Sequence, residues 1–259
     1  MDLKDLHGTT LGLIRRWTEE GSDVERTAWG EVLRTDAYPL VHWANMGWVD
    51  RVPGDGIGTV LEDLEVAFRK APTPHRYLIV ADASAAYACQ DALVAAGFTP
   101  RVEVAMARVG PPSCIVNEDL EIREVRGDAL EEDFRRVTAA IHAERGYGGE
   151  ESRQVHAHDR ERARALGERA YVGYLGGSAV ATVGLWPQGA YGLVGNVATL
   201  PGHRMKGVGR TMIHEALNEA TRAKVEWALL TAERETWVPT MYETLGFHPV
   251  GELWQFLRA

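Results

Sequence analysis

The stretch Arg204-Met205-Lys206-Gly207-Val208-Gly209 decides how this sequence is interpreted, because it lies between two segments of opposite character. Residues 191–200 before it are rich in β-formers, and residues 208–221 after it carry apolar side chains at helical spacing. A strand, a glycine-bearing loop and a helix together present unpaired N–H groups to an anion at the helix N-terminus. His203 and Arg210 add positive charge to that of Arg204 and Lys206. The segment therefore predicts a site for a phosphate-bearing ligand.

Two common nucleotide-binding patterns do not match this loop. A Walker loop needs Gly-Lys followed by Ser or Thr, whereas Lys206 precedes its glycine. A dinucleotide fingerprint needs a third glycine three places after Gly209, and that place is Met212. The Walker and dinucleotide interpretations of this loop are therefore weak.

The pattern that matches, Gln/Arg-x-x-Gly-x-Gly/Ala, resembles motif A of the GNAT N-acetyltransferase superfamily. Upstream, residues 196–201 resemble the GNAT strand that enters this loop. Downstream, residues 241–247 resemble the Tyr-x-x-x-Gly-Phe segment of motif B. Together these motifs lie within about the last 140 residues, which is a usual size for one domain.

The resemblance implies an acetyl-CoA site and assigns roles to residues of this chain. Acetyl-CoA is expected as co-substrate, without a metal. Tyr242 is the expected general acid for the leaving thiolate, and its alternative role is that of a packing aromatic. The expected cofactor-binding residues are Val197, Ala198 and Thr199 beside pantetheine, and Arg204, Met205, Lys206, Gly207, Val208, Gly209 and Arg210 at the pyrophosphate.

The order of the other segments predicts an α/β (α+β) fold. Gly176-Gly177 joins two β-rich runs as a hairpin, residues 227–232 predict a strand, and Gly246 ends a helix predicted over about 237–245. A mixed order of this kind predicts a mostly antiparallel sheet flanked by helices.

A linker and an internal repeat predict two domains. Gly110-Pro111-Pro112-Ser113 separates residues 1–110 from a segment that begins at Cys114 and runs to residue 259. Each segment ends with a strand, a helix, Gly-Phe and a last strand, and Gly97-Phe98 matches Gly246-Phe247. In the first segment the strand before the helix is predicted over 77–83, and in the second the last strand is predicted over about 250–257. We therefore expect two tandem GNAT-like domains, residues 1–110 and 114–259.

The first copy is expected to be degenerate. It lacks the Arg-x-x-Gly-x-Gly loop, and Leu93 stands where the second copy has Tyr242. The glycine-rich segment 54–58 precedes a helix predicted over 59–70, but its Asp55 would repel a pyrophosphate. We interpret the segment as a turn, and the first domain as a packing partner that shapes the substrate cleft.

Composition argues against several other classes of protein. The 259 residues carry a formal net charge of −9, which disfavours nucleic-acid binding. No apolar run reaches the length of a membrane span, and no secretory signal is apparent. With two cysteines, Cys89 and Cys114, a disulfide framework is not expected. A cytoplasmic location is the expectation.

The general base cannot be assigned from the sequence. The candidates, each more often a solvated charge than a catalyst, are Glu144, Glu150, Glu151, His142, His156, His158 and Glu233. A metal site built on His156-x-His158 is rejected, because no cysteine pair supports it. Tyr147 and Trp237 are weak candidates for substrate contact.

The sequence therefore favours an acyl-CoA-dependent N-acetyltransferase that acts on a primary amine of a small molecule or peptide, by direct attack in a ternary complex. The alternative is a non-catalytic acyl-CoA sensor or regulatory module. The sequence assigns neither the acceptor, nor the acyl-chain preference, nor an oligomeric state.

Overall fold

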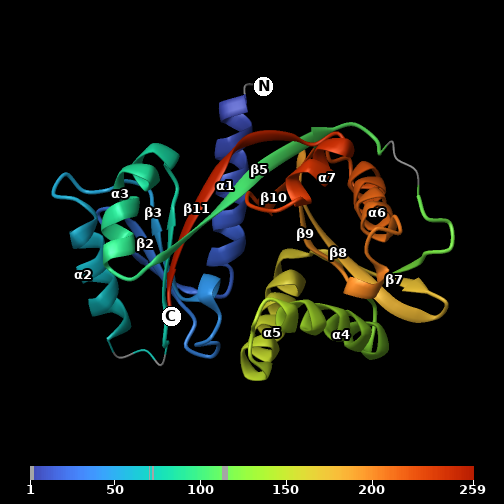
Figure 1. Cartoon of the computed structure of the whole chain (residues 1–259), viewed down its shortest axis with the longest axis horizontal. Coiled ribbons are helices and arrows are strands. Elements are labelled where there is room, and N and C mark those ends of the chain that lie inside the picture. Colours follow the sequence, from blue (N-terminus) through green and yellow to red (C-terminus); the bar gives the residue numbers. More distant parts are fainter. Residues whose placement is uncertain (1–2, 70, 72, 113–115) are drawn as a thin grey trace. The chain divides into compact units, whose positions relative to one another are not determined.

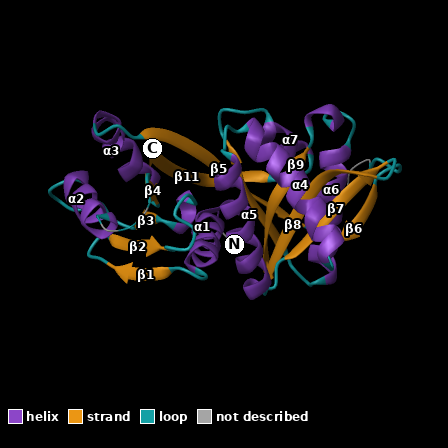
Figure 2. Cartoon of the chain, turned by 90° about the horizontal axis from the view of Figure 1, so that it is seen from below, coloured by secondary structure: helices purple, strands orange, loops and turns teal. Residues whose placement is uncertain are grey.

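The computed structural model describes residues 3–69, 71, 73–112 and 116–259, and the elements are drawn in Figures 1 and 2. By its contacts the chain divides into two compact units. The first holds residues 1–105, 231–239 and 249–259, and the second holds 106–230 and 240–248. The domain ranges 1–110 and 114–259 remain predictions, and Ser113 and Cys114 lie outside the described residues.

The first unit is an α/β sheet with the strand order β1-β2-β3-β4-β11-β5. The β1–β2, β2–β3 and β4–β11 pairs are antiparallel, and the β3–β4 pair is parallel. The elements are α1 (Leu3–Glu19), β1 (Asp23–Arg26), β2 (Gly30–Arg34), η1 (His42–Ala44), β3 (Met46–Val49), α2 (Ile57–Phe68), β4 (Arg76–Val80), α3 (Ala83–Ala95), most of β5 (Thr99–Val109) and β11 (His248–Arg258).

The second unit continues with the strand order β10-β9-β8-β7-β6, in which the β9–β10 pair is parallel and the others are antiparallel. Its elements are β6 (Glu121–Glu124), α4 (Asp128–Glu144), α5 (Gly149–Leu166), β7 (Arg169–Leu175), β8 (Ser178–Gln188), β9 (Tyr191–Thr199), η2 (Pro201–His203), α6 (Val208–Arg222), most of β10 (Trp227–Glu233) and most of α7 (Val238–Thr244).

Alternation along the strands gives the first unit two hydrophobic layers. Val32 belongs to the core cluster that contains residues of α2 and α3, whereas its neighbour Leu33 belongs to the cluster packed with Leu11 and Ile14 of α1. Because successive side chains of a strand point to opposite faces, α1 covers one face of the sheet and α2 and α3 the other.

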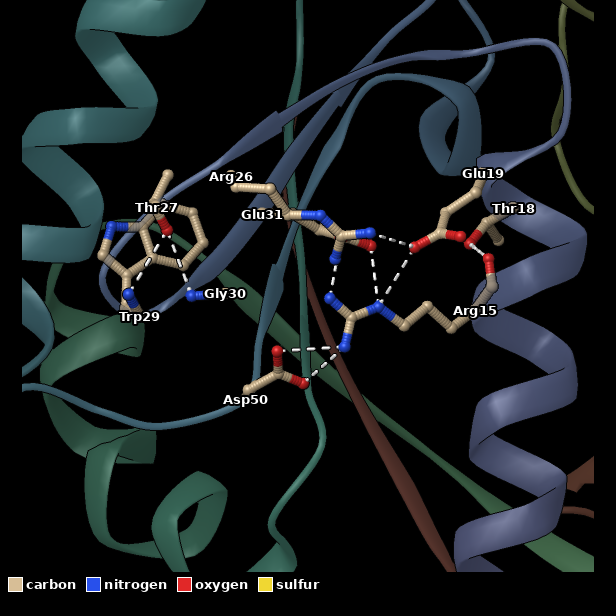
Figure 3. Close-up of polar contacts among 9 residues, drawn as sticks. All are labelled: Arg15, Thr18, Glu19, Arg26, Thr27, Trp29, Gly30, Glu31 and Asp50. Carbon is tan, nitrogen blue, oxygen red and sulfur yellow. Dashed lines mark hydrogen bonds and ion pairs between the residues drawn. The ribbon is translucent and has the colours of Figure 1, made fainter.

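A buried carboxylate ties α1 to the sheet of the first unit (Figure 3). The side chain of Glu31 is fully buried and pairs with Arg15 of α1 and with Arg26 of β1. Arg15 also donates hydrogen bonds of 2.9 Å to both carboxylate oxygens of Asp50. An open cavity of about 450 Å³ borders this network. Since Arg15 and Arg26 are already paired with acids, we assign the cluster to the structure of α1, β1 and β2.

Helices cover both faces of the sheet in the second unit as well. Phe134 and Val137 of α4 pack in one cluster with Val172 and Tyr174 of β7. The residue between them, Gly173, faces the other way, and a Cβ there would lie 2.7 Å from Met212 Sδ of α6. The glycine therefore lets α6 lie close to the strand.

The expected fold class is confirmed: the sheets are mixed, mostly antiparallel and flanked by helices. The predicted hairpin is formed by β7 and β8, with positive φ at Gly176 and Gly177. Two boundaries were wrong. The strand predicted over 77–83 ends at Val80, because the side chain of Asp82 accepts the Ala85 N–H and begins α3. Gly58, predicted in a turn, lies in α2.

The two Gly-Phe segments have the same backbone geometry. Gly97 and Gly246 adopt φ angles of 87° and 83°. Phe98 N–H donates to the Leu93 carbonyl at 3.0 Å, and Phe247 N–H donates to the Tyr242 carbonyl at 3.1 Å. Such bonds satisfy the last carbonyls of a helix. The predicted helix over 237–245 is confirmed as α7, and Lys70 of the helix predicted over 59–70 lies outside the described residues.

No helix in the described part of the chain is both long and apolar enough to cross a membrane.

Candidate acyl-CoA site

The site begins at a strand edge that the sheet of the second unit leaves open. The register pairs Tyr191–Leu193 of β9 with Trp227–Leu229 of β10, and no later pair between these strands is formed by described residues. On its other edge β9 pairs with β8 as far as Thr199. Residues 194–199 therefore present backbone groups along one edge, to which an extended, amide-containing ligand can pair as an added strand.

A β-bulge turns the backbone within this open stretch. The register of β8 and β9 shifts between Thr182 and Gly184, and Asn196 has a positive φ of 52°. Thr182 Oγ1 donates to the Asn196 carbonyl at 2.8 Å. Because a trans peptide is planar, the following N–H, that of Val197, points in the opposite direction from this carbonyl. The bulge thus re-aims an amide donor on the open stretch.

One carboxylate lies against the bulge. Asn196 Nδ2 donates to Glu168 Oε1 at 3.0 Å. The same oxygen occupies the space where residue 184 would carry a Cβ, which explains the glycine at this position. Glu168 immediately precedes β7 and is half-buried. Glu168 was not among the residues predicted from the sequence. The signal for it is Gly184 inside an apolar strand, where a glycine marks a close approach.

The predicted phosphate loop has open amides. Met205 and Gly207 adopt φ angles of 60° and 77°, and α6 begins at Val208. The first bond of the helix runs from Thr211 N–H to the Gly207 carbonyl at 3.0 Å. Among the described residues none accepts the N–H groups of Lys206, Gly207, Val208 and Gly209. This is the arrangement that binds an anion at a helix N-terminus.

The carbonyls of the loop are turned away from these amides. Asn117 Nδ2 donates to the Lys206 carbonyl at 2.9 Å. The Gly207 carbonyl accepts both the N–H and the hydroxyl of Thr211. A Cβ at Gly209 would lie 3.3 Å from Thr199 Oγ1, so the helix starts close to the end of β9.

Positive charge around the loop is partly neutralised. Arg204 donates through both terminal nitrogens to the carboxylate of Glu144, and through Nε to the Thr199 carbonyl at 3.1 Å. The guanidinium lowers the pKa of Glu144 below its ordinary value. Lys206 Nζ donates to the Gly202 carbonyl at 2.9 Å, and Arg210 is exposed in the first turn of α6.

Tyr242 is buried on α7, with its ring centroid 5.7 Å from that of Phe247. The end of this helix is fixed by Arg108, whose Nε donates to the Leu245 carbonyl at 2.7 Å. The loop, the open stretch of β9 and Tyr242 all belong to the second unit.

The acidic base candidates from the sequence all have partners. Glu144 binds Arg204, and Glu150 binds Arg153 and Gln154. Glu151 accepts the Gly148 N–H at 3.3 Å, and in the first unit Glu233 accepts from Arg101 at 3.0 Å. These contacts account for the four carboxylates as surface or capping groups.

The histidine candidates lie on α4 and α5. His142 is stacked on Tyr147, and its Nδ1 lies 2.9 Å from Ser152 Oγ. Burial lowers the pKa of His142 and of His156. His158 is buried, with Nδ1 3.8 Å from Asp159 Oδ1. Among the described residues no group of three or more His, Cys, Asp or Glu is arranged to hold a metal ion.

Comparison with protein families matches residues 167–249 to the acetyltransferase (GNAT) domain model. This range holds Glu168, the open stretch of β9, the phosphate loop and Tyr242, and the match indicates an acetyltransferase that uses acetyl-CoA. Comparison with the curated proteins finds no match.

Solved structures share the fold over nearly the whole chain. A GCN5-related N-acetyltransferase from Kribbella flavida is 18% identical, with a TM-score of 0.71 over 100% of this chain and 96% of that one. A conserved protein of unknown function from Staphylococcus epidermidis is 15% identical, with a TM-score of 0.75 over 93% and 94%.

A third structure is a tandem GNAT protein from the clavulanic acid biosynthesis pathway. It is 16% identical, with a TM-score of 0.59 over 92% of this chain and 83% of that one. At these identities the likeness shows the fold, and it agrees with two tandem GNAT-like folds. Residues 167–249 therefore match a GNAT acetyltransferase domain, and nearly the whole chain shares its fold with solved GNAT structures.

Proposed function

We propose that the second unit transfers an acetyl group from acetyl-CoA to a primary amine of a small molecule or peptide, by direct attack in a ternary complex. The observation that carries the proposal is the open edge of β9 running into a loop of unpaired amides. The thioester supplies an activated acyl group, which the amine nitrogen attacks with loss of the thiolate.

The length of the pantetheine arm supports a placement of acetyl-CoA along the open stretch of β9. The loop amides hold the diphosphate at one end, and Val197, Ala198 and Thr199 offer backbone partners to the two amides of the pantetheine arm. That arm is about as long as four extended residues, roughly 13 Å. Its sulfur end then reaches the bulge at Asn196, where the re-aimed N–H of Val197 is a donor for the thioester carbonyl.

Two side chains complete the proposed chemistry. Glu168, hydrogen-bonded to Asn196 beside the bulge, accepts a proton from the substrate ammonium group, directly or through water, and the resulting neutral amine attacks the thioester carbonyl. Tyr242 donates its phenolic proton to the departing thiolate, and its buried position keeps bulk water away from that step. Arg204, Met205, Lys206 and Arg210 surround the diphosphate, and the ligand competes with Glu144 for Arg204.

The experiment is a thiol-release assay with acetyl-CoA and a panel of primary amines. Release that depends on one class of amine is the expected result, and Tyr242→Phe should reduce it while Tyr87→Phe, an exposed tyrosine of the first unit, should not. Tight binding of acetyl-CoA without amine-dependent release from any panel member would contradict the proposal and favour the sensor alternative. A cytoplasmic location remains a prediction.

A further inference from the structure

The phosphate loop is held from behind by a residue outside the GNAT motifs. Asn117 lies in the segment before β6, and its Nδ2 donates to the Lys206 carbonyl at 2.9 Å. Its Oδ1 accepts the Asp119 N–H at 3.0 Å. Since the oxygen is already engaged with a donor, the orientation of the side-chain amide is determined, and the nitrogen must face the loop.

Thr211 makes the second half of this support. Its hydroxyl accepts the Asn117 N–H at 2.7 Å and donates to the Gly207 carbonyl at 3.0 Å. Thr211 is buried in the first turn of α6. The pair Asn117 and Thr211 therefore fixes two consecutive loop carbonyls, those of Lys206 and Gly207.

Fixing these carbonyls fixes two amide donors. In a planar trans peptide the N–H points opposite to the preceding C=O. The Lys206 carbonyl held by Asn117 thus sends the Gly207 N–H to the other side of the loop, and the Gly207 carbonyl held by Thr211 does the same for Val208 N–H. Neither of these N–H groups has an acceptor among the described residues.

The loop needs such support because its backbone has freedom to rotate. Gly207 has no Cβ to restrict it, and both it and Met205 occupy the left-handed region. Rotation of the Lys206–Gly207 peptide would replace a donor with a carbonyl oxygen on the ligand side. A carbonyl there repels a phosphate. The hydrogen bond from Asn117 therefore determines whether this peptide attracts or repels the diphosphate.

We propose that Asn117 is a positioning residue that aims the Gly207 N–H at the diphosphate of the acyl donor, an inference that rests on the proposed function. It contributes to recognition of the diphosphate and leaves recognition of the pantetheine arm unchanged. Thr211 likewise aims the Val208 N–H at the diphosphate.

The test compares two probes that differ in the diphosphate. Binding of coenzyme A and of pantetheine is measured by NMR on ¹⁵N-labelled full-length protein, with the Gly207 amide as reporter. Asn117→Ala should weaken coenzyme A binding about tenfold, the effect of one charge-assisted hydrogen bond, and leave pantetheine binding unchanged. The Gly207 resonance should respond to coenzyme A in the wild type and no longer in the variant.

Matched variants distinguish a positioning role of Asn117 from a general loss of structure. Glu118→Ala changes an exposed neighbour and should bind both probes like the wild type. Asn117→Asp keeps the acceptor for Asp119 N–H but loses the donor, and should match or exceed the loss in Asn117→Ala. Thr211→Ser keeps the hydroxyl and should bind normally, whereas Thr211→Val should not.

The outcomes distinguish this inference from the proposed function. If the wild type binds no coenzyme A, the proposed function fails. If the wild type binds it and Asn117→Ala binds it equally well, the inference is wrong and the proposed function stands. Equal weakening of coenzyme A and pantetheine would also overturn the inference, because a loss independent of the diphosphate is not positioning.

Discussion

Arg204, the first residue of the phosphate-loop motif, donates hydrogen bonds through both terminal nitrogens to the carboxylate of Glu144, the last residue of α4. A carboxylate and a phosphate offer the same paired oxygens to a guanidinium. Glu144 therefore engages Arg204 in the way that a diphosphate would, and under the proposed function it competes with the ligand for this side chain.

Removing that competition should tighten cofactor binding. We predict that Glu144→Gln lowers the Kd for coenzyme A two- to fivefold at low ionic strength, with less effect at high salt because the pair is exposed. Calorimetric titration at two salt concentrations measures this. Glu150→Gln, which removes an exposed carboxylate paired with Arg153, is the control. Weaker binding in Glu144→Gln would show that the pair supports the loop instead of competing for it.

Tyr242 should act on turnover and leave the fold intact. Tyr242→Phe removes the hydroxyl and keeps the ring that packs on Phe247, so the melting temperature should change little. Loss of a general acid should lower kcat about a hundredfold. A kcat within twofold of the wild type would assign Tyr242 to packing alone. Steady-state kinetics together with thermal unfolding distinguishes these results.

Gly184 should control activity through Glu168. An alanine Cβ at position 184 would collide with Glu168 Oε1, whereas Gly195, its partner in the register, has open space around its missing Cβ. We predict that Gly184→Ala lowers kcat ten- to a hundredfold, as Glu168→Gln does, and that Gly195→Ala does not. Combining Gly184→Ala with Glu168→Gln should add little further loss, because both act on one carboxylate. Full additivity in kcat would contradict a shared cause.

His75 should make the first unit sensitive to acid. Burial and the nearby His42, whose ring centroid lies 4.4 Å away, lower the pKa of His75 to about 3. The unfolded chain takes up the proton near the ordinary pKa of about 6.5, so the stabilisation is complete above that pH and is lost as the pH falls towards 3.

The expected slope from His75 is up to about 1.4 kcal/mol of unfolding free energy per pH unit in this window. Urea unfolding between about pH 7.5 and 5 measures it. His75→Gln should flatten the dependence, and the same change at the exposed His248 should leave it as in the wild type. Parallel slopes in His75→Gln and the wild type would contradict the assignment.

Local signals were enough to predict the repeat and the loop. Gly97-Phe98 and Gly246-Phe247 form the same helix end, and both copies hold a parallel strand pair, β3–β4 and β9–β10. The described residues between the paired strands include one α-helix in each copy, α2 and α6. In the first copy β3 ends at Val49, the last residue paired with β4. In the second, β9 runs on to Thr199. The longer strand β9 supplies the open edge of the second copy.

Features that depend on contacts between distant segments could not be predicted from the sequence. The last strand, β11, pairs through residues 254–258 with residues 76–80 of β4, which lie far away along the chain. Strand pairing between distant segments depends on side-chain packing in three dimensions, which local periodicity does not encode. Glu168 and Asn117 were missed for the same reason, since each acts on a residue far along the chain, Asn196 and Lys206.

The proposed function depends on capture of a diphosphate by the backbone amides that follow Arg204. Calorimetric titration of the full-length protein with coenzyme A tests this most directly. We predict saturable heat with a micromolar to submillimolar Kd, strongly weakened by Lys206→Glu, while Gly202→Ala, at an open position of η2, binds as the wild type. Absence of heat with well-folded protein, or equal affinity in Lys206→Glu, would contradict it.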